Sequence, residues 1–245
     1  MTNVPIGMKS TVEEIRQRFD GEVERFTDLN TGQISIIDAK YSLELITEAA
    51  KRLVPHAENL LDVGCGAGNC TLTMLQKIPN LNCTLADLSK PMLDRAFERI
   101  SSQTEGKIET VQGDIRNMAL RENHFDIILA SAVLHHLRDD GDWENVFAKL
   151  YRMLKPGGCL MISDLISHDI GVLTEYFWQK YADYLDKTGG QSYRQKVFDY
   201  VAKEDSPQSI TRQLELMKKT GFASVEILHK NVCFGAFCGL KQKTV

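Results

Sequence analysis

The sequence predicts an α/β protein with a doubly wound, mostly parallel sheet, N-terminal helices and an inserted helical cap. From residue 60 to residue 163, short apolar runs alternate with amphipathic segments of helical length, as in βαβ units. The run at residues 125–130 is apolar after Asp126, as expected for a strand buried on both faces. Glycines at alternate positions follow the first apolar run, which is typical of a turn that lies close to a ligand.

The N-terminal extension, residues 1–55, is predicted to be helical. One helix is expected from Thr11, where apolar residues recur with the helical period. A second helix is expected over residues 41–53, and Pro55 stops it. Residues 28–32 between them are predicted to be a loop.

Five strands and three helices are predicted in the central region. The strands are residues 60–63, 82–86, 107–112, 125–130 and 159–163, and the helices are residues 70–78, 89–100 and 142–154. Ser89 is the expected N-cap of the second helix, with Pro91 in its first turn. Residues 155–158, Lys-Pro-Gly-Gly, are expected to end the third helix in a sharp turn.

Residues 165–206 are expected to form the helical cap, because they are rich in aromatic residues and show no strand pattern. Gly189 and Gly190 should divide this cap into two helical stretches. The cap could pack on the domain or on a second subunit, or serve as a lid over a substrate.

The end of the chain is predicted to form a helix and a β-hairpin. The helix covers residues 207–220, with Gly221 just past its end. The hairpin strands are residues 223–229 and 232–239, which leaves Lys230-Asn231 as the turn.

The composition is that of a single soluble domain spanning residues 1–245. Hydrophobic residues make up 43% and charged residues 25% of the sequence, and the formal net charge is −4. This charge gives no clear signal for nucleic-acid binding. No apolar run approaches the roughly 20 residues that a membrane helix needs, and we expect no membrane association. The six cysteines form no C-x-x-C pair, so buried thiols, a cytoplasmic location and no metal site are expected.

The alternating glycines are Gly64, Gly66 and Gly68, a G-x-G-x-G spacing that differs from the G-x-G-x-x-G of dinucleotide sites. Asp62, just before the turn, would repel a phosphate and attract an ammonium group, although a capping role for its side chain stays open. Asp87 follows about 20 positions later, where a carboxylate can hold ribose hydroxyls. The best-matched ligand carries an amine, a carboxylate and a ribose.

Residues 62–68, Asp-Val-Gly-Cys-Gly-Ala-Gly, resemble the first motif of the class I S-adenosylmethionine-dependent methyltransferases. The resemblance implies a seven-stranded sheet with helices on both faces and an antiparallel last strand. It also implies methyl transfer from S-adenosyl-L-methionine, with S-adenosyl-L-homocysteine as product. The acceptor is expected to be a small molecule that the sequence does not identify.

The residues expected to bind the cofactor come from the strand ends and from this resemblance. Asp114 and Ile115 match the family positions that hold adenine. Ser131 ends a strand at the edge of the sheet where ligands bind. The full set is Tyr41, Asp62, Gly64, Cys65, Gly66, Gly68, Asp87, Leu88, Met92, Asp114, Ile115 and Ser131.

Catalytic residues are not fixed by the sequence, and the candidates are His135, His136 and Asp164. The two histidines follow the fourth strand, where a general base could act. A packing or cofactor-contact role is favoured for them. Asp164 follows the fifth strand and could meet a substrate or cap the next segment.

The overall layout also resembles the carboxy-S-adenosylmethionine synthases, which make a carboxylated cofactor from prephenate for tRNA wobble-uridine modification. Tyr41 matches a cofactor-contacting tyrosine of that group, and residues 234–237, Phe-Gly-Ala-Phe, match its ending. Arg194 lies near the place of the arginine that holds the added carboxylate, although Gln195 aligns with it. This activity is the alternative function. A homodimer through the N-terminal helices or the cap is a further open expectation.

Overall fold

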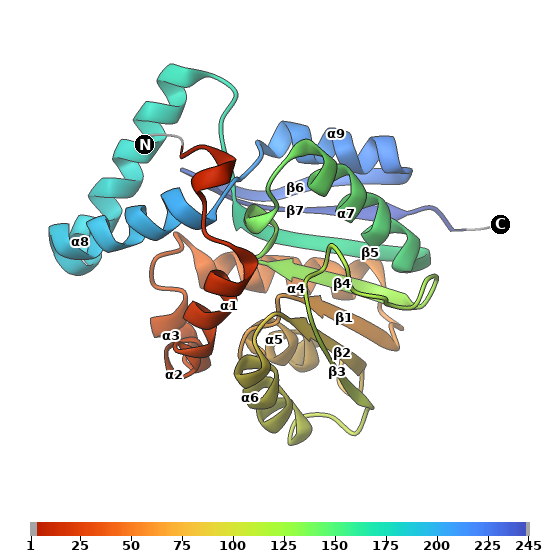
Figure 1. The fold of residues 1–245 in the computed structure, drawn as a ribbon. Coiled ribbons are helices and arrows are strands. Elements are labelled where there is room, and N and C mark those ends of the chain that lie inside the picture. Colours follow the sequence, from red (N-terminus) through yellow and green to blue (C-terminus); the bar gives the residue numbers. More distant parts are fainter. Residues whose placement is uncertain (1–3, 244–245) are drawn as a thin grey trace.

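The computed structural model describes residues 4–243 and contains one seven-stranded sheet in the order β3-β2-β1-β4-β5-β7-β6 (Figure 1). The strands are β1 (Asn59–Val63), β2 (Asn82–Asp87), β3 (Ile108–Gln112), β4 (Phe125–Ser131), β5 (Leu154–Leu165), β6 (Phe222–Asn231) and β7 (Phe234–Lys241). Strands β1 to β5 pair in parallel, and β7 is antiparallel to both of its neighbours. The predicted fold class and the antiparallel last strand are confirmed.

Helices cover both faces of the sheet. They are α1 (Val12–Asp20), α2 (Val23–Thr27), α3 (Leu29–Gly32), α4 (Ala39–Leu53), α5 (Asn69–Lys77), α6 (Lys90–Ser101), α7 (Asp140–Met153), α8 (Gly171–Glu204) and α9 (Ile210–Thr220), with short 3-10 turns η1 (Ile6–Met8) and η2 (Leu134–His136). Helices α4, α5 and α6 pack on one face, and α7 and α9 pack on the other. None of the helices within residues 4–243 combines the length and apolar character needed to span a bilayer.

The side chains of β1 alternate between the two hydrophobic cores. Leu60 belongs to the core under α4, α5 and α6, whereas Leu61 and Val63 belong to the core under α7 and α9. Each of these leucines is fully buried, which contributes roughly 1.5–3 kcal/mol per side chain. This two-sided burial fixes β1 in the middle of the sheet and so places the residues that follow Val63 at its carboxyl edge.

The N-terminal extension is helical, but its boundaries differ from the predicted ones. The prediction of a loop at residues 28–32 is wrong, because the chain forms the short helix α3 there. The side chain of Asp28 caps this helix by accepting a hydrogen bond from the Asn30 N–H at 2.7 Å. Helix α4 begins at Ala39, two residues before the predicted start.

Two boundaries in the second half of the chain also differ. Residues 155–158 fall within the bounds of β5, which begins directly after α7 with Leu154. They form an irregularity there, since the pairing passes from Phe125 with Leu154 to Ile127 with Cys159 and Gly157 takes a positive φ of 81°. Helix α9 begins only at Ile210, because the hydroxyl of Ser209 caps it by accepting from the Arg212 N–H at 3.3 Å. Ser209 also forms a bridge with Ser167, which holds the preceding residues extended.

The hairpin turn lies at Val232-Cys233 and not at the predicted Lys230-Asn231. Asn231 is still in β6 and pairs with Phe234, and its side-chain amide donates to the Asp38 carboxylate at 2.8 Å. Val232 takes a positive φ of 53°, and Cys233 is completely buried. Burial of Cys233 against the cap decides the position of the turn.

The cap consists of two helical arms within α8 that meet at Gly190, where φ is 77°. This confirms the predicted division. The arms enclose a third, smaller core, which contains Tyr181 and Leu185 and reaches the sheet through Leu165 and Phe234. We propose on this basis that residues 1–245 act as a single domain.

Helices α1 to α3 and the cap lie together beyond one end of the strands (Figure 1). Arg18 in α1 donates from Nε and Nη2 to the buried carboxylate of Glu204 in α8, at 2.7 and 2.5 Å. The backbone N–H of Ser10 donates to the Lys203 carbonyl at 2.9 Å. These contacts bind α1 to the end of the cap.

We predict that Glu204→Gln lowers the free energy of unfolding by about 1–3 kcal/mol. The substitution takes the buried carboxylate away from the Arg18 guanidinium, whose side chain is only 23% exposed, and leaves Glu22 as its remaining charged partner. Urea unfolding measures the effect. Glu175→Gln, on an exposed position of the same helix, is the matched control and should change stability by less than about 0.5 kcal/mol. Equal stabilities of the two variants would contradict the importance of this pair.

Candidate active site

The residues after β1 form a tight turn against β2. Gly64, Gly66 and Gly68 all have positive φ, at 65°, 50° and 86°. The N–H groups of Gly64 and Cys65 both donate to the Ala86 carbonyl, at 2.8 and 3.1 Å. The turn is therefore anchored to β2, and its three glycines adopt backbone angles that other residues rarely take.

The three glycines face different surroundings. A Cβ atom on Gly64 would lie 2.4 Å from Cγ2 of Val133, and one on Gly68 would lie 2.9 Å from Cδ1 of Ile100. A Cβ atom on Gly66 would meet nothing within 4 Å. Gly64 and Gly68 therefore allow close packing, whereas Gly66 presents bare backbone to an open space.

Asp87 holds this turn in place from the end of β2. Its Oδ2 accepts from the Gly66 N–H and its Oδ1 accepts from the Ser89 N–H, both at 2.8 Å. Burial raises the pKa of this carboxyl. Each carboxylate oxygen can accept a second hydrogen bond, so the group suits two neighbouring hydroxyls of a ribose.

Asp62 lies beneath the turn and is 1% exposed. Its Oδ2 accepts from the backbone N–H and the hydroxyl of Thr71, at 3.2 and 2.7 Å, which ties it to α5. Its Oδ1 is buried without a hydrogen-bond partner among the described residues. Burial raises the pKa of Asp62 to about 7. The capping role exists, and the unpartnered oxygen fits an additional cationic group such as an ammonium.

The turn opens on a first cavity of about 1150 Å³, part of which is open to solvent. Helix α1 closes one side of it through Phe19, and α2 contributes Phe26, whose carbonyl accepts from the Asn69 side chain at 2.8 Å. The predicted cofactor residues that line this cavity are Gly64, Cys65, Gly66, Asp87, Leu88, Met92, Asp114, Ile115 and Ser131. The cavity has room for an adenosyl group.

Tyr41 does not lie at this cavity. Its side chain is 56% exposed and packs edge-on against His229, with ring centroids 5.2 Å apart. It lines neither this cavity nor the second one described below. The prediction for Tyr41 is corrected, because α4 turns this residue outward.

Gly68 and Asp62 also lie outside the cavity lining. Gly68 is the N-cap of α5 and packs against Ala96 and Ile100 of α6. Gly68 can therefore affect a ligand only through the shape of the turn, and Asp62 can meet one only through its unpartnered Oδ1 atom.

Asp114 lines the first cavity, but its carboxylate already binds a neighbour. Arg116 donates to it from Nη2 at 2.5 Å and from Nε at 3.0 Å, and also binds Asp142 at 2.9 Å. Burial alone would raise the pKa of Asp114, but the hydrogen bonds from Arg116 lower it. An adenine amino group would therefore share this carboxylate with Arg116. Arg116 lines the cavity but is not among the residues that the sequence predicted.

A second cavity of about 790 Å³ adjoins the first. The two cavities share Phe19, Phe26, Gln33, Ile36, Ser131, Ala132 and His136 as lining residues. Tyr181 and Tyr200 of the cap line the second cavity only, as do Asp164 and Asp205. A ligand in one cavity is therefore next to a ligand in the other.

His135 is buried and enclosed by two carboxylates. Its Nδ1 pairs with the Asp164 carboxylate, which also accepts from the His135 backbone N–H at 3.1 Å. Its Nε2 lies 3.7 Å from Oδ1 of Asp205. Burial alone would lower the pKa of His135, but the two carboxylates outweigh it and raise the pKa to about 9. The imidazole is thus protonated at neutral pH, which argues against His135 and Asp164 as free general bases.

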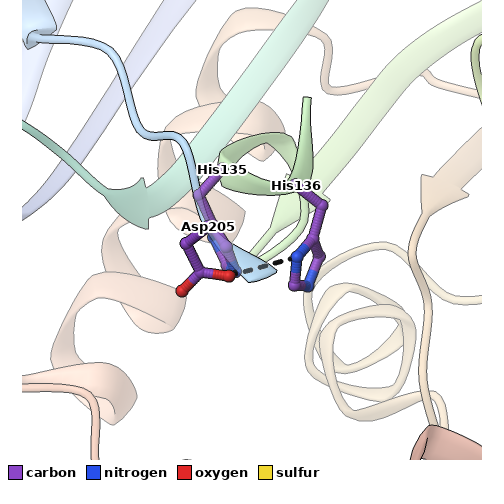
Figure 2. A group of neighbouring side chains, drawn as sticks. All are labelled: His135, His136 and Asp205. Atoms are coloured by element: carbon purple, nitrogen blue, oxygen red, sulfur yellow. Dashed lines mark ion pairs between the residues drawn. The ribbon is translucent and has the colours of Figure 1, made fainter. Parts of the chain in front are cut away.

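His136 is the catalytic candidate that lines both cavities. Its Nδ1 lies 3.2 Å from Oδ1 of Asp205 (Figure 2). Burial alone would raise the pKa of Asp205, but His135 and His136 lower it. Asp205 follows the cap and was missed in the sequence, where no spacing links it to the histidines.

Comparisons with known proteins agree with this geometry. Residues 60–158 match the protein family described as a methyltransferase domain. A demethylmenaquinone methyltransferase of Listeria monocytogenes is 26% identical over 215 residues, which cover 85% of this chain and 89% of that protein. A carboxy-S-adenosyl-L-methionine synthase of Cronobacter sakazakii is 26% identical over 206 residues, 81% of each chain.

The fold also matches solved structures. The structure of human N-acetylserotonin methyltransferase in complex with SAM superposes with a TM-score of 0.64 at 18% identity. The match covers 98% of this chain but only 61% of that chain, so this chain spans about three fifths of its length. The glycine turn, the sheet order, the methyltransferase domain matched over residues 60–158 and these relatives together support a class I S-adenosylmethionine-dependent methyltransferase.

Proposed function

We propose that this enzyme binds S-adenosylmethionine in the first cavity and methylates a small-molecule acceptor in the second. The proposal depends on one observation. The Asp87 carboxylate accepts a hydrogen bond from the Gly66 N–H, and both residues line a cavity that adjoins a second one. The bound sulfonium supplies an activated methyl group. The main task of the protein is then to hold donor and acceptor in line, which can contribute roughly 7–11 kcal/mol.

Each side of the first cavity offers a different contact to the cofactor. Asp87 accepts from the ribose hydroxyls, and the unpartnered Oδ1 of Asp62 attracts the ammonium group. Met92 and Ile115 provide apolar walls for the adenine ring, and Asp114 is within reach of its amino group. The lining thus presents polar groups at its floor and apolar surface at its sides.

The second cavity favours a small acceptor with an aromatic or apolar body. Its arginines, Arg18 and Arg25, are both paired with Glu22. It therefore offers no unpaired arginine to an anion. The aromatic side chains that line it are Phe19, Phe26, Tyr181, Tyr200 and Phe234. Polar groups of the acceptor would meet His136 and Asp205, where an acceptor proton can be taken up.

Mass spectrometry of the nucleoside that co-purifies with the protein separates this function from its alternative. Methyl transfer predicts plain S-adenosylmethionine or S-adenosylhomocysteine, and a carboxylated cofactor would support the carboxy-S-adenosylmethionine synthase. Arg194 gives that alternative no support, since it pairs with Asp186 at 2.6 Å and lines neither cavity. Release of S-adenosylhomocysteine with pooled metabolites as acceptors then tests turnover.

The affinity for S-adenosylmethionine should rise with pH and level off above about 7, the pKa of Asp62 in the free protein. Below this pKa the free protein carries a proton on Asp62 that the incoming ammonium must displace. Each pH unit below it should weaken binding by up to about tenfold. Calorimetry from about pH 5 to about pH 8 measures the slope, and Asp62→Asn should remove it. A flat wild-type profile would show that Asp62 does not face the ammonium.

We also propose a cytoplasmic location and keep the homodimer as a proposal. All six cysteines lie within the described residues and are buried and without disulfides, as in a reducing compartment. The first arm of α8 exposes Val172, Leu173 and Tyr176, which supports self-association through the cap.

A further inference from the structure

His135, His136 and Asp205 form a compact group of ligand-type side chains at the boundary of the two cavities (Figure 2). One donor atom from each lies within 4.8 Å of the others. Oδ1 of Asp205 lies 3.2 Å from Nδ1 of His136 and 3.7 Å from Nε2 of His135. Tetrahedral ligands at bond lengths of about 2.0–2.1 Å are roughly 3.3 Å apart, so these two spacings suit a common ion after a small adjustment.

Two of these atoms lack a satisfactory partner. Nδ1 of His136 and Oδ1 of Asp205 are buried, and neither has a hydrogen-bond partner of good geometry among the described residues. Asp205 as a whole is only 6% exposed. A buried polar atom without a partner costs about 1–3 kcal/mol, so both atoms point to a missing group between them.

Asp164 provides the outer contact that metal-binding histidines need. Its carboxylate pairs with Nδ1 of His135, which leaves Nε2 of the same ring directed toward Asp205. Ligating histidines almost always donate their second ring N–H in this way, because the contact fixes the tautomer and the ring orientation. Asp164 itself is 3% exposed, so its contact with His135 is shielded from water.

We propose that His135, His136 and Asp205 bind one divalent transition-metal ion of the zinc type, and that His135 releases its Nε2 proton to solvent as the ion binds. Two imidazoles and one carboxylate are a donor set that such ions favour. The three side chains all line the second cavity, so the remaining coordination position would face the acceptor. No metal site was expected from the sequence, where that expectation rested on the spacing of the cysteines.

The role of this ion rests on the proposed function, whereas its binding does not. An acceptor hydroxyl at the open position would lose its proton to water more readily, because the ion stabilises the oxyanion. Cofactor binding by metal-free protein therefore tests methyl transfer separately from the metal site.

Metal uptake by the full-length protein tests the proposal. Protein treated with a chelator and dialysed is titrated with Zn²⁺ by calorimetry, and the bound metal is counted by mass spectrometry. We expect one ion per chain, and a loss of affinity on the order of 100-fold in Asp205→Asn and in His136→Gln. Asp38→Asn is the matched control, because Asp38 forms an ordinary pair with His229 at 2.9 Å. It should bind like the wild type.

The structure of each variant is checked by near-UV circular dichroism. If Asp205→Asn fails to fold, metal uptake by His136→Gln tests the site instead. X-ray absorption of Co²⁺-loaded wild type is a further test, and we expect it to show two imidazole ligands. Absence of stoichiometric uptake by wild type, unchanged uptake in His136→Gln, or a cobalt site without imidazoles would overturn the proposal. S-adenosylmethionine binding that persists in metal-free protein would leave the proposed function intact.

Discussion

Replacing Asp87 with alanine is expected to weaken S-adenosylmethionine binding by on the order of 100-fold or more. The carboxylate is expected to accept two hydrogen bonds from the ribose, and bonds to a charged group contribute roughly 1.5–3 kcal/mol each. The substitution also removes the acceptor that holds the Gly66 N–H at 2.8 Å, so the turn loses one of its anchors to β2. Calorimetric titration measures the change.

Asp94→Ala is the matched control for this variant. Asp94 lies in the neighbouring helix α6, is exposed and pairs only with Lys90 among the ion pairs of the described residues. Its removal should leave the affinity unchanged, since exposed ion pairs contribute little. Wild-type affinity for S-adenosylmethionine in a folded Asp87→Ala protein would show that Asp87 does not bind the ribose.

Gly64→Ala is expected to lower the free energy of unfolding by about 2–5 kcal/mol and to abolish cofactor binding. The new Cβ atom would lie 2.4 Å from Cγ2 of Val133, and the backbone would keep a φ of 65° that alanine disfavours. The turn must shift to relieve both, which moves Gly66 away from Asp87. Thermal and urea unfolding measure the stability, and calorimetry measures the binding.

Two further variants separate the effect of the close contact with Val133 from the effect of the positive φ on the stability of Gly64→Ala. Gly171→Ala should be close to neutral, because nothing lies within 4 Å of the added Cβ and the φ there is not positive. Adding Val133→Ala to Gly64→Ala removes the closest contact and should recover part of the lost stability, while the contact with Cβ of residue 133 at 2.7 Å and the cost of the positive φ remain. A single Gly64→Ala protein as stable as the wild type would mean that the turn is not packed as described.

The sequence predicted the glycine turn and Asp87 because their signals are local. Gly64, Gly66 and Gly68 follow a buried strand directly, and Asp87 ends the next strand of a parallel sheet. Neighbouring parallel strands bring their carboxyl ends to one edge, so chain order alone places these residues together.

Other parts of the site depend on contacts that no spacing encodes. Phe19 and Asp205 reach the cavities only because α1 and the cap dock over the sheet, held together by Arg18 and Glu204. Tyr41 was placed by resemblance alone, and it lies on the exposed side of α4. Long-range packing decided all of these positions.

The hairpin turn is a smaller example of a position that local sequence preference does not predict. Lys230-Asn231 has the composition of a two-residue turn, yet the chain turns at Val232-Cys233. Burial of Cys233 against the cap and the bond from Asn231 to Asp38 outweigh the local preference.

Titration of metal-free, nucleoside-free protein with S-adenosylmethionine is the decisive measurement for the glycine turn and Asp87 as the cofactor site. We expect one binding site per chain, for which S-adenosylhomocysteine competes, and an affinity on the order of 100-fold weaker in Asp87→Ala but unchanged in Asp94→Ala. Absence of binding at millimolar ligand, or equal binding in both variants, would contradict it.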